Sequence, residues 1–177
     1  MAKEKNIKVI YISTFACYNP SNVYGKTKHE AEKSIKKLNN YVIIRPSLIV
    51  GLSPNAQNHN FFNDLLKASK EKQAVEADSS WEFEMSSLTH LSETIETIIE
   101  RGDINRVTIP LVEHGKTSRY KIAKTILEEF DIEVKEINQN RIIPIPDFNE
   151  SIYTELNLPR KSYDESIKQI IEELKDK

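Results

Sequence analysis

Two short runs rich in β-branched and apolar residues, Ile7 to Ser13 and Tyr41 to Arg45, constrain the fold of this chain most. Such runs are typical of strands that are buried on both faces of a parallel sheet. Residues 23–38 lie between them and place apolar side chains, among them Ala31 and Ile35, on one face of a helix. Strand, helix and strand in this order predict an α/β protein with parallel strands.

The rest of the chain predicts smaller and less regular elements. Further helices are expected over residues 60–72, 90–101, 118–130 and 162–174, and further strands over 73–77, 82–85, 106–112 and 132–137. Pro110 lies inside one of these strands, which predicts a sheet edge or a strand end there. Residues 138–160 are expected to be irregular. We therefore expect two regions, 1–55 with the parallel sheet and 56–177 with smaller α+β elements, some of which return to the first region.

Glycine is scarce and scattered, and this excludes two kinds of nucleotide site. The 177 residues contain four glycines, at positions 25, 51, 102 and 115. A dinucleotide fingerprint and a phosphate-binding P-loop both need glycines clustered at a strand–helix turn. Neither motif is present in this sequence.

Charge and cysteine content exclude further classes. The formal net charge is −2, which does not favour nucleic acid or an anionic membrane surface as a partner. The apolar run near the N-terminus is too short for a signal peptide or a membrane span. Cys17 is the one cysteine, so no internal disulfide can form, and the four histidines show no metal-ligand spacing. We expect a cytoplasmic protein without a metal site.

A group of polar residues that could take part in catalysis follows the first strand. Ser13 and Thr14 end that strand, and Tyr24 begins a helix ten residues after Thr14. Lys28 lies one turn beyond Tyr24 on the same helix face. A tyrosine hydroxyl has a pKa of about 10, and a nearby ammonium group would lower it by favouring the phenolate. A strand-end hydroxyl can polarise a carbonyl oxygen while such a tyrosine delivers a proton.

These residues resemble the extended short-chain dehydrogenase/reductases that act on nucleotide sugars, and within them the dTDP-4-dehydrorhamnose reductases. Four segments carry the resemblance: YIST (Tyr11–Thr14), NVYGKTKHEAEK (Asn22–Lys33), YVIIRPSLIVG (Tyr41–Gly51) and NFFNDLLKASKEK (Asn60–Lys72). The resemblance implies the second half of a Rossmann-like parallel sheet plus a smaller α+β substrate-binding region. It also implies NAD(P)H-dependent reduction of a dTDP-4-keto-6-deoxy sugar in dTDP-rhamnose biosynthesis.

The resemblance also assigns roles to individual residues. Thr14 would polarise the carbonyl, Tyr24 would deliver the proton and Lys28 would lower the pKa of Tyr24. The residues implied in cofactor binding are Tyr24, Lys28, Arg45, Pro46 and Ser47, and those implied in substrate binding are Ser13, Asn60 and Phe61. Two alternatives stay open: residues 45–47 also fit a plain strand exit, and Asn60 with Phe61 also fits a helix cap followed by a core side chain.

Three other features have simpler interpretations. Tyr120 and Lys124 repeat the Tyr-x-x-x-Lys spacing, but no separate strand-end hydroxyl precedes them, and we interpret them as coincidental. Glu30 and Glu32 alternate with lysines and indicate a solvated helix face. Trp81 is expected in the core or at an interface.

The chain departs from the resembling family in two ways. It lacks the family's glycine-rich strand–turn–helix half, and the loop from Thr14 to Tyr24 is short, with Phe15 in the place of an aspartate. These departures disfavour cofactor binding and turnover by this chain alone. One of the two strands, Ile7 to Ile12 or Val42 to Ile44, would then present an apolar edge, which predicts pairing with a second copy or with a separate cofactor-binding half. Two alternatives are a catalytically inactive relative that serves as a binding or regulatory subunit, and a fragment of a longer gene.

Overall fold

The computed structural model describes residues 6–52 and 60–176, and these form two compact units that are interleaved along the chain. The first unit consists of the residues up to Ser47, His90–Val112 and Pro146–Arg160. The second consists of Leu48–Thr89, Glu113–Ile145 and the residues from Lys161 onward. The region boundary expected between residues 55 and 56 lies outside the described residues, and the functional division into 1–55 and 56–177 stays a prediction.

The first unit is built on a parallel three-stranded sheet in the order β1-β2-β7. Its strands are β1 (Val9–Ile12), β2 (Tyr41–Pro46) and β7 (Val107–Leu111). All six residues of β2 are buried, as expected for a central strand of a parallel sheet. The sheet confirms the predicted α/β class with parallel strands. It also confirms the edge position of the proline-containing strand, because β7 pairs with β2 alone among the described strands.

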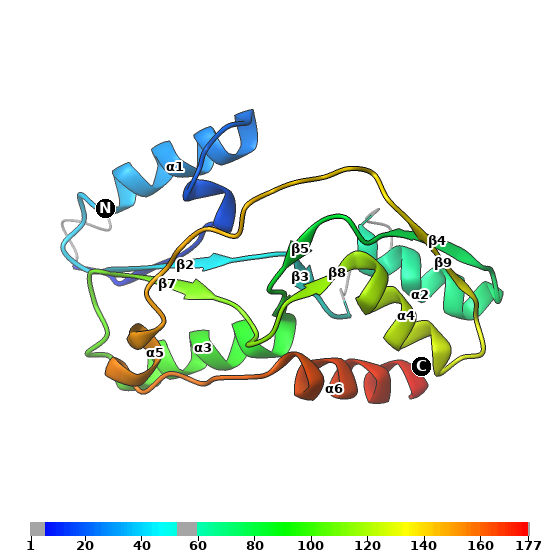
Figure 1. Cartoon of the computed structure of the whole chain (residues 1–177). Coiled ribbons are helices and arrows are strands. Elements are labelled where there is room, and N and C mark those ends of the chain that lie inside the picture. The colour runs from blue at the N-terminus through cyan, green and yellow to red at the C-terminus, as the bar shows by residue number, and fades with distance from the viewer. Residues whose placement is uncertain (1–5, 53–59, 177) are drawn as a thin grey trace. The chain divides into compact units, whose positions relative to one another are not determined.

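Helices α1 (Val23–Ile35) and α3 (Leu88–Arg101) lie on opposite faces of this sheet (Figure 1). The α3 face is apolar, and its buried cluster includes Val42, Ile44 and Ile109 of the strands and Ile98 of the helix. Because successive strand residues point to opposite faces, Arg45 points away from this cluster and toward α1. The α1 face of the sheet therefore carries a buried charged side chain next to the apolar Ile43.

One short helix was missed by the sequence patterns. Residues 138–160 were expected to be irregular, but Ser151–Glu155 form α5. Its buried Tyr153 donates a hydrogen bond to the Pro110 carbonyl and accepts one from the backbone nitrogen of Val112. These tertiary contacts fix a five-residue helix that local propensity alone does not predict.

The second unit combines helices with short strands. Its helices are α2 (Phe61–Glu71), α4 (Arg119–Glu128) and α6 (Tyr163–Lys175). Its strand pairs are β3 (Ile49–Val50) with β6 (Ser86–Ser87), β4 (Val75–Asp78) with β9 (Val134–Ile137), and β5 (Glu82–Phe83) with β8 (Thr117–Ser118). One apolar core joins them, with Leu65, Met85 and Ile126 fully buried. This arrangement agrees with the smaller α+β elements expected from the sequence.

Side-chain caps begin the helices of the second unit where the sequence predicts them. Asn60 caps α2 and Ser118 caps α4, each by accepting a backbone hydrogen bond three residues ahead. Ser162 and Glu165 form a capping box at the start of α6. In the described part of the chain, none of these or the other helices is both long enough and apolar enough to cross a membrane.

Candidate active site

The end of β1 presents the first of the expected catalytic side chains. Thr14 follows the strand in an extended conformation and caps the 3-10 helix η1 (Phe15–Cys17). Its Oγ1 accepts a hydrogen bond from the backbone nitrogen of Ala16 at 3.3 Å. This bond uses the oxygen as an acceptor, so the Thr14 O–H proton stays available for donation to a carbonyl oxygen.

The start of α1 is packed directly against η1. Asn22 caps the helix by accepting a hydrogen bond from the Gly25 nitrogen at 2.7 Å. A Cβ on Gly25 would lie 2.9 Å from the carbonyl oxygen of Ala16, closer than real Cβ contacts allow. Glycine at this position therefore lets the first turn of α1 approach the loop that follows Thr14. Tyr24 lies in that turn and is 57% exposed.

Lys28 is fixed at the carboxyl end of β1. Its Nζ donates a hydrogen bond to the Ile12 carbonyl oxygen at 2.7 Å and lies 4.7 Å from the centroid of the Tyr11 ring. Lys28 follows Tyr24 by one helical turn, so the ammonium group lies on the tyrosine's side of the helix. An ammonium group has three donors, and one of them is used here. The structure thus places Thr14 and the Lys28 ammonium group at one end of β1, with Tyr24 in the first turn of α1.

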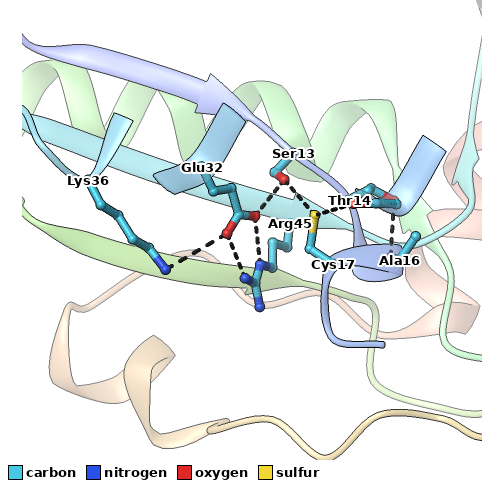
Figure 2. Close-up of polar contacts among 8 residues, drawn as sticks. Ser13, Thr14, Ala16, Cys17, Glu32, Lys36 and Arg45 are labelled. Carbon is cyan, nitrogen blue, oxygen red and sulfur yellow. Dashed lines mark hydrogen bonds and ion pairs between the residues drawn. The ribbon is translucent and has the colours of Figure 1, made fainter. Parts of the chain in front are cut away.

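A buried ion pair joins α1 to the sheet beside these residues (Figure 2). Glu32 is 1% exposed and receives two hydrogen bonds from Arg45, from Nε at 2.8 Å and from Nη2 at 2.6 Å. Ser13 Oγ donates a third at 2.6 Å, and Lys36 Nζ lies 3.8 Å away. The prediction of a solvated helix face was wrong for Glu32, because a partner on β2 compensates its charge. Glu30 is exposed, as expected.

Electrostatics agree with an ionised Glu32. Burial raises its pKa, but the hydrogen bonds from Arg45 and Ser13 and the charge of Arg45 together outweigh burial and hold the pKa below its usual value. Hydrogen bonding to Glu32, in which Arg45 is the donor, is also the main reason that the pKa of Arg45 is raised. A charge-assisted bidentate pair of this kind fixes both side chains and both elements. Sequence reasoning missed Glu32; its place one turn beyond Lys28 was the one available signal.

Arg45 and Ser13 are thus engaged in structural contacts. Arg45 is 9% exposed and its guanidinium also lies over the Tyr18 ring, 4.4 Å from the centroid. Ser13 is 3% exposed. Pro46 ends β2 and Ser47 follows it. The cofactor roles of residues 45–47 and the substrate role of Ser13 stay predictions.

Aromatic rings fill the region just beyond Thr14. Phe15, in the place where the resemblance led us to expect an aspartate, makes edge contacts with Tyr18 at 5.2 Å and Phe148 at 5.3 Å between ring centroids. Tyr18 and Phe148, together with Arg45, line a pocket of about 320 Å³ in the same unit. This end of the sheet is therefore more apolar than a polar substrate loop would make it.

The remaining expected site residues belong to the second unit. Asn60 caps α2 and Phe61 is the first residue of that helix. Phe61 is half-buried, packs against the core of its unit and lies beside the Arg119 guanidinium. Both alternatives for these residues therefore stay open: they form a helix start, and Phe61 also borders a cationic side chain. The second Tyr-x-x-x-Lys pair, Tyr120 and Lys124, lies on α4 of this unit.

The parallel sheet β1-β2-β7, with helices on both of its faces (Figure 1), defines a Rossmann-like α/β fold. The family described as the RmlD substrate binding domain matches residues 1–163, and the chain belongs to that family. None of the curated proteins matches this chain.

Solved structures confirm the fold. The dTDP-4-dehydrorhamnose reductase from Yersinia enterocolitica is similar with a TM-score of 0.79 and 19% identity, covering 98% of this chain and 69% of that one. The dTDP-4-dehydrorhamnose reductase from Bacillus anthracis in complex with NADP has a TM-score of 0.81 and 18% identity, covering 97% and 68%. The dTDP-glucose 4,6-dehydratase from Bacillus anthracis in complex with NAD has a TM-score of 0.79 and 11% identity, covering 99% and 64%. The expected resemblance to dTDP-4-dehydrorhamnose reductases is therefore confirmed.

Proposed function

We propose that this chain carries the catalytic side chains of an NAD(P)H-dependent reductase for a dTDP-4-keto-6-deoxy sugar. The observation that carries the proposal is the position of Lys28. Its ammonium group binds the carbonyl of Ile12, two residues before Thr14, at the carboxyl end of β1. Lys28 also follows the exposed Tyr24 by one helical turn. Membership in a family of dTDP-4-dehydrorhamnose reductase-like proteins supports the choice of substrate class.

In the proposed mechanism, the three residues act on one carbonyl group of the sugar. Thr14 donates a hydrogen bond to the carbonyl oxygen and polarises it, and Tyr24 delivers the proton that this oxygen takes up. Lys28 supplies a hydrogen-bond donor for a ribose hydroxyl. A bound nicotinamide cofactor supplies the hydride. The carbonyl carbon gains the hydride and the oxygen gains the proton, so the product is an alcohol.

The residues of the first unit fit the nicotinamide end of such a cofactor better than its diphosphate end. Tyr24 is exposed and Lys28 keeps two free donors, which suits a ribose. Gly25 is used for packing against Ala16, and the sequence holds no glycine cluster that could cradle phosphates. We therefore propose that a diphosphate-binding element outside these 177 residues completes the site.

The free side of β1 is the place we propose for that element or for a second copy of the chain. Among the described strands β1 pairs only with β2, so its other edge offers backbone donors and acceptors. All four of its residues are half-buried within this unit. A strand added there would extend the parallel sheet.

The test is reduction of a dTDP-4-keto sugar with NADPH and NADH by this chain together with a glycine-rich cofactor-binding half. Tyr24→Phe removes the proton donor and is expected to lower turnover by about 10²- to 10⁴-fold. Tyr120→Phe is the matched control, since it changes the other Tyr-x-x-x-Lys tyrosine on a different unit and should leave turnover unchanged. Equal turnover in wild type and Tyr24→Phe would refute the assignment.

A second candidate is a family relative without catalysis that acts as a binding or regulatory subunit. The aromatic cluster of Phe15, Tyr18 and Phe148 just beyond Thr14 favours it, because it takes the space of a polar substrate loop. This candidate predicts a stable complex with a partner whose function survives Tyr24→Phe. Loss of that function in the variant would count against it.

A further inference from the structure

The pocket of about 320 Å³ in the first unit lies over β7, on the α1 face of the sheet. The sheet lines it with Thr108 and Pro110 of β7 and with Arg45 of β2. These three side chains share one face, because Thr108 and Pro110 are two residues apart and Pro110 is the neighbour of Arg45 in the sheet. Lys36, directly after α1, and residues 147–149, ahead of α5, complete most of the lining.

Lys36 supplies a positive charge to this pocket. Its Nζ lies 3.8 Å from Glu32 Oε2, which is too long for a hydrogen bond (Figure 2). The Glu32 carboxylate already accepts two hydrogen bonds from Arg45 and one from Ser13. One carboxylate therefore faces two cations. The Lys36 side chain is 46% exposed, and its ammonium group keeps its donors and its charge for a ligand.

Asp147 supplies a negative charge from a different segment of the chain. It is exposed, and none of the residues that the structure describes forms a hydrogen bond or an ion pair with it. Lys36 and Asp147 thus line one pocket without pairing with each other. A simple anion would be attracted by Lys36 and repelled by Asp147, whereas a molecule with both charges is attracted by both residues.

The rest of the lining is largely apolar. The rings of Tyr18 and Phe148 are both half-buried, and edge contacts with Phe15 hold them in place. Pro110 and Ile152 add aliphatic surface. Apolar walls with a few polar groups are typical of small-molecule sites, and this volume is at the lower end of their range. The pocket therefore suits a ligand with a small apolar body and two opposite charges.

We propose that this pocket binds a free α-amino acid with an apolar side chain. Lys36 donates hydrogen bonds to the carboxylate of the ligand, and Asp147 accepts them from its ammonium group. The side chain of the ligand packs against the rings of Tyr18 and Phe148. This inference goes beyond the proposed function, because none of the three proposed catalytic side chains lines the pocket.

The experiment is isothermal titration calorimetry of the full chain with four probes. L-phenylalanine carries both charges and an apolar side chain, and we expect it to bind with a Kd of about 10 μM to 1 mM, the range for so small a ligand. The other probes each lack one feature: 3-phenylpropanoate lacks the ammonium group, 2-phenylethylamine lacks the carboxylate, and glycine lacks the side chain. Each should bind about tenfold or more weakly than L-phenylalanine.

Two variants with matched controls test the charges. Lys36→Gln and Asp147→Asn should each weaken binding of L-phenylalanine by about tenfold. Lys33→Gln, on the same helix as the residues that lead to Lys36, and Glu150→Gln, near Asp147, remove exposed charges that have other partners and do not line the pocket. Both controls should bind L-phenylalanine like the wild type. Circular dichroism of each variant verifies that it is folded.

Four results would overturn the amino-acid site. They are absence of L-phenylalanine binding to the folded wild type, unchanged affinity in Lys36→Gln or in Asp147→Asn, binding of 3-phenylpropanoate or 2-phenylethylamine as tight as that of L-phenylalanine, and equally tight binding of glycine. Each of these results leaves the Tyr24→Phe turnover test standing. Conversely, Tyr24→Phe should bind L-phenylalanine with unchanged affinity even if turnover proves to be absent.

Discussion

Glu32→Gln is the substitution with the largest expected effect on stability. The side chain keeps its size but loses its charge, while the Arg45 guanidinium stays buried at 9% exposure. Two charge-assisted hydrogen bonds from Arg45 and one from Ser13 are lost or weakened. Removal of one partner from a buried ion pair costs about 3–5 kcal/mol, because the other charge is left without compensation. We expect the free energy of unfolding to fall by this amount.

The assay is urea unfolding followed by far-UV circular dichroism, with the change read from the midpoint at constant slope. Glu30→Gln is the matched control: Glu30 lies on the same helix and pairs with Lys33 at 2.7 Å, but both side chains are more than half exposed, so little change is expected. A combined Glu32→Leu and Arg45→Met variant removes both charges and should be more stable than Glu32→Gln alone.

The same ion pair predicts a pH dependence. The pKa of Glu32 is lower in the folded chain than in the unfolded chain, where it is about 4.3. The stabilisation is therefore fully present above about pH 4.3 and is lost as the pH falls through the folded-state pKa. Glu32→Gln has no such group to protonate, so the stability difference between wild type and variant should shrink in acid.

Two results would refute this reasoning. One is a Glu32→Gln midpoint equal to that of Glu30→Gln, which would mean that the Glu32 carboxylate is not buried against Arg45. The other is a wild-type minus Glu32→Gln difference that stays constant from neutral pH down to acid, which would mean that no pKa shift is linked to folding.

Two further predictions test the packing around η1. Cys17 is 3% exposed and burial raises the pKa of its thiol, so a thiol reagent should modify it far more slowly in the native chain than in urea; equal rates would contradict its burial. Gly25→Ala should lower the urea midpoint relative to Ser34→Ala on the same helix, because the added Cβ meets the Ala16 backbone at a cost of about 1–3 kcal/mol that exceeds the gain of about 1 kcal/mol in helix propensity. A higher midpoint in Gly25→Ala would show that the contact relaxes freely.

Much of the fold could be predicted from local patterns. The run from Tyr41 and the helix from Val23 were recognised from apolar periodicity and appear as β2 and α1. Periodicity works here because a parallel strand and an amphipathic helix each repeat their burial over several residues. The short α5 was missed, since five residues hold too little pattern and their helix depends on the Tyr153 contacts with β7.

The candidate site was predictable in part. Thr14, Tyr24 and Lys28 were identified from spacing and resemblance, because a helix places residues four apart on one face. Glu32 follows Lys28 by the same spacing of four residues, but the lysines around it led to the prediction of a solvent-exposed side chain. Only the approach of Arg45 from β2 makes its burial possible, and a contact between residues thirteen apart on different elements leaves no local signal.

By itself, the sequence determined the class of this protein, because the features that indicate it are local. These features are the alternation of apolar strands with amphipathic helices, the Tyr24–Lys28 pair after a strand-end hydroxyl, and the absence of a glycine cluster. The tertiary structure alone decided which polar groups are buried together, away from solvent. It paired Glu32 with Arg45, and it left Arg119 between Phe61 and Trp81 without an acceptor for Nε. The physical reason is that desolvation and charge compensation depend on neighbours in space, which the order of residues does not state.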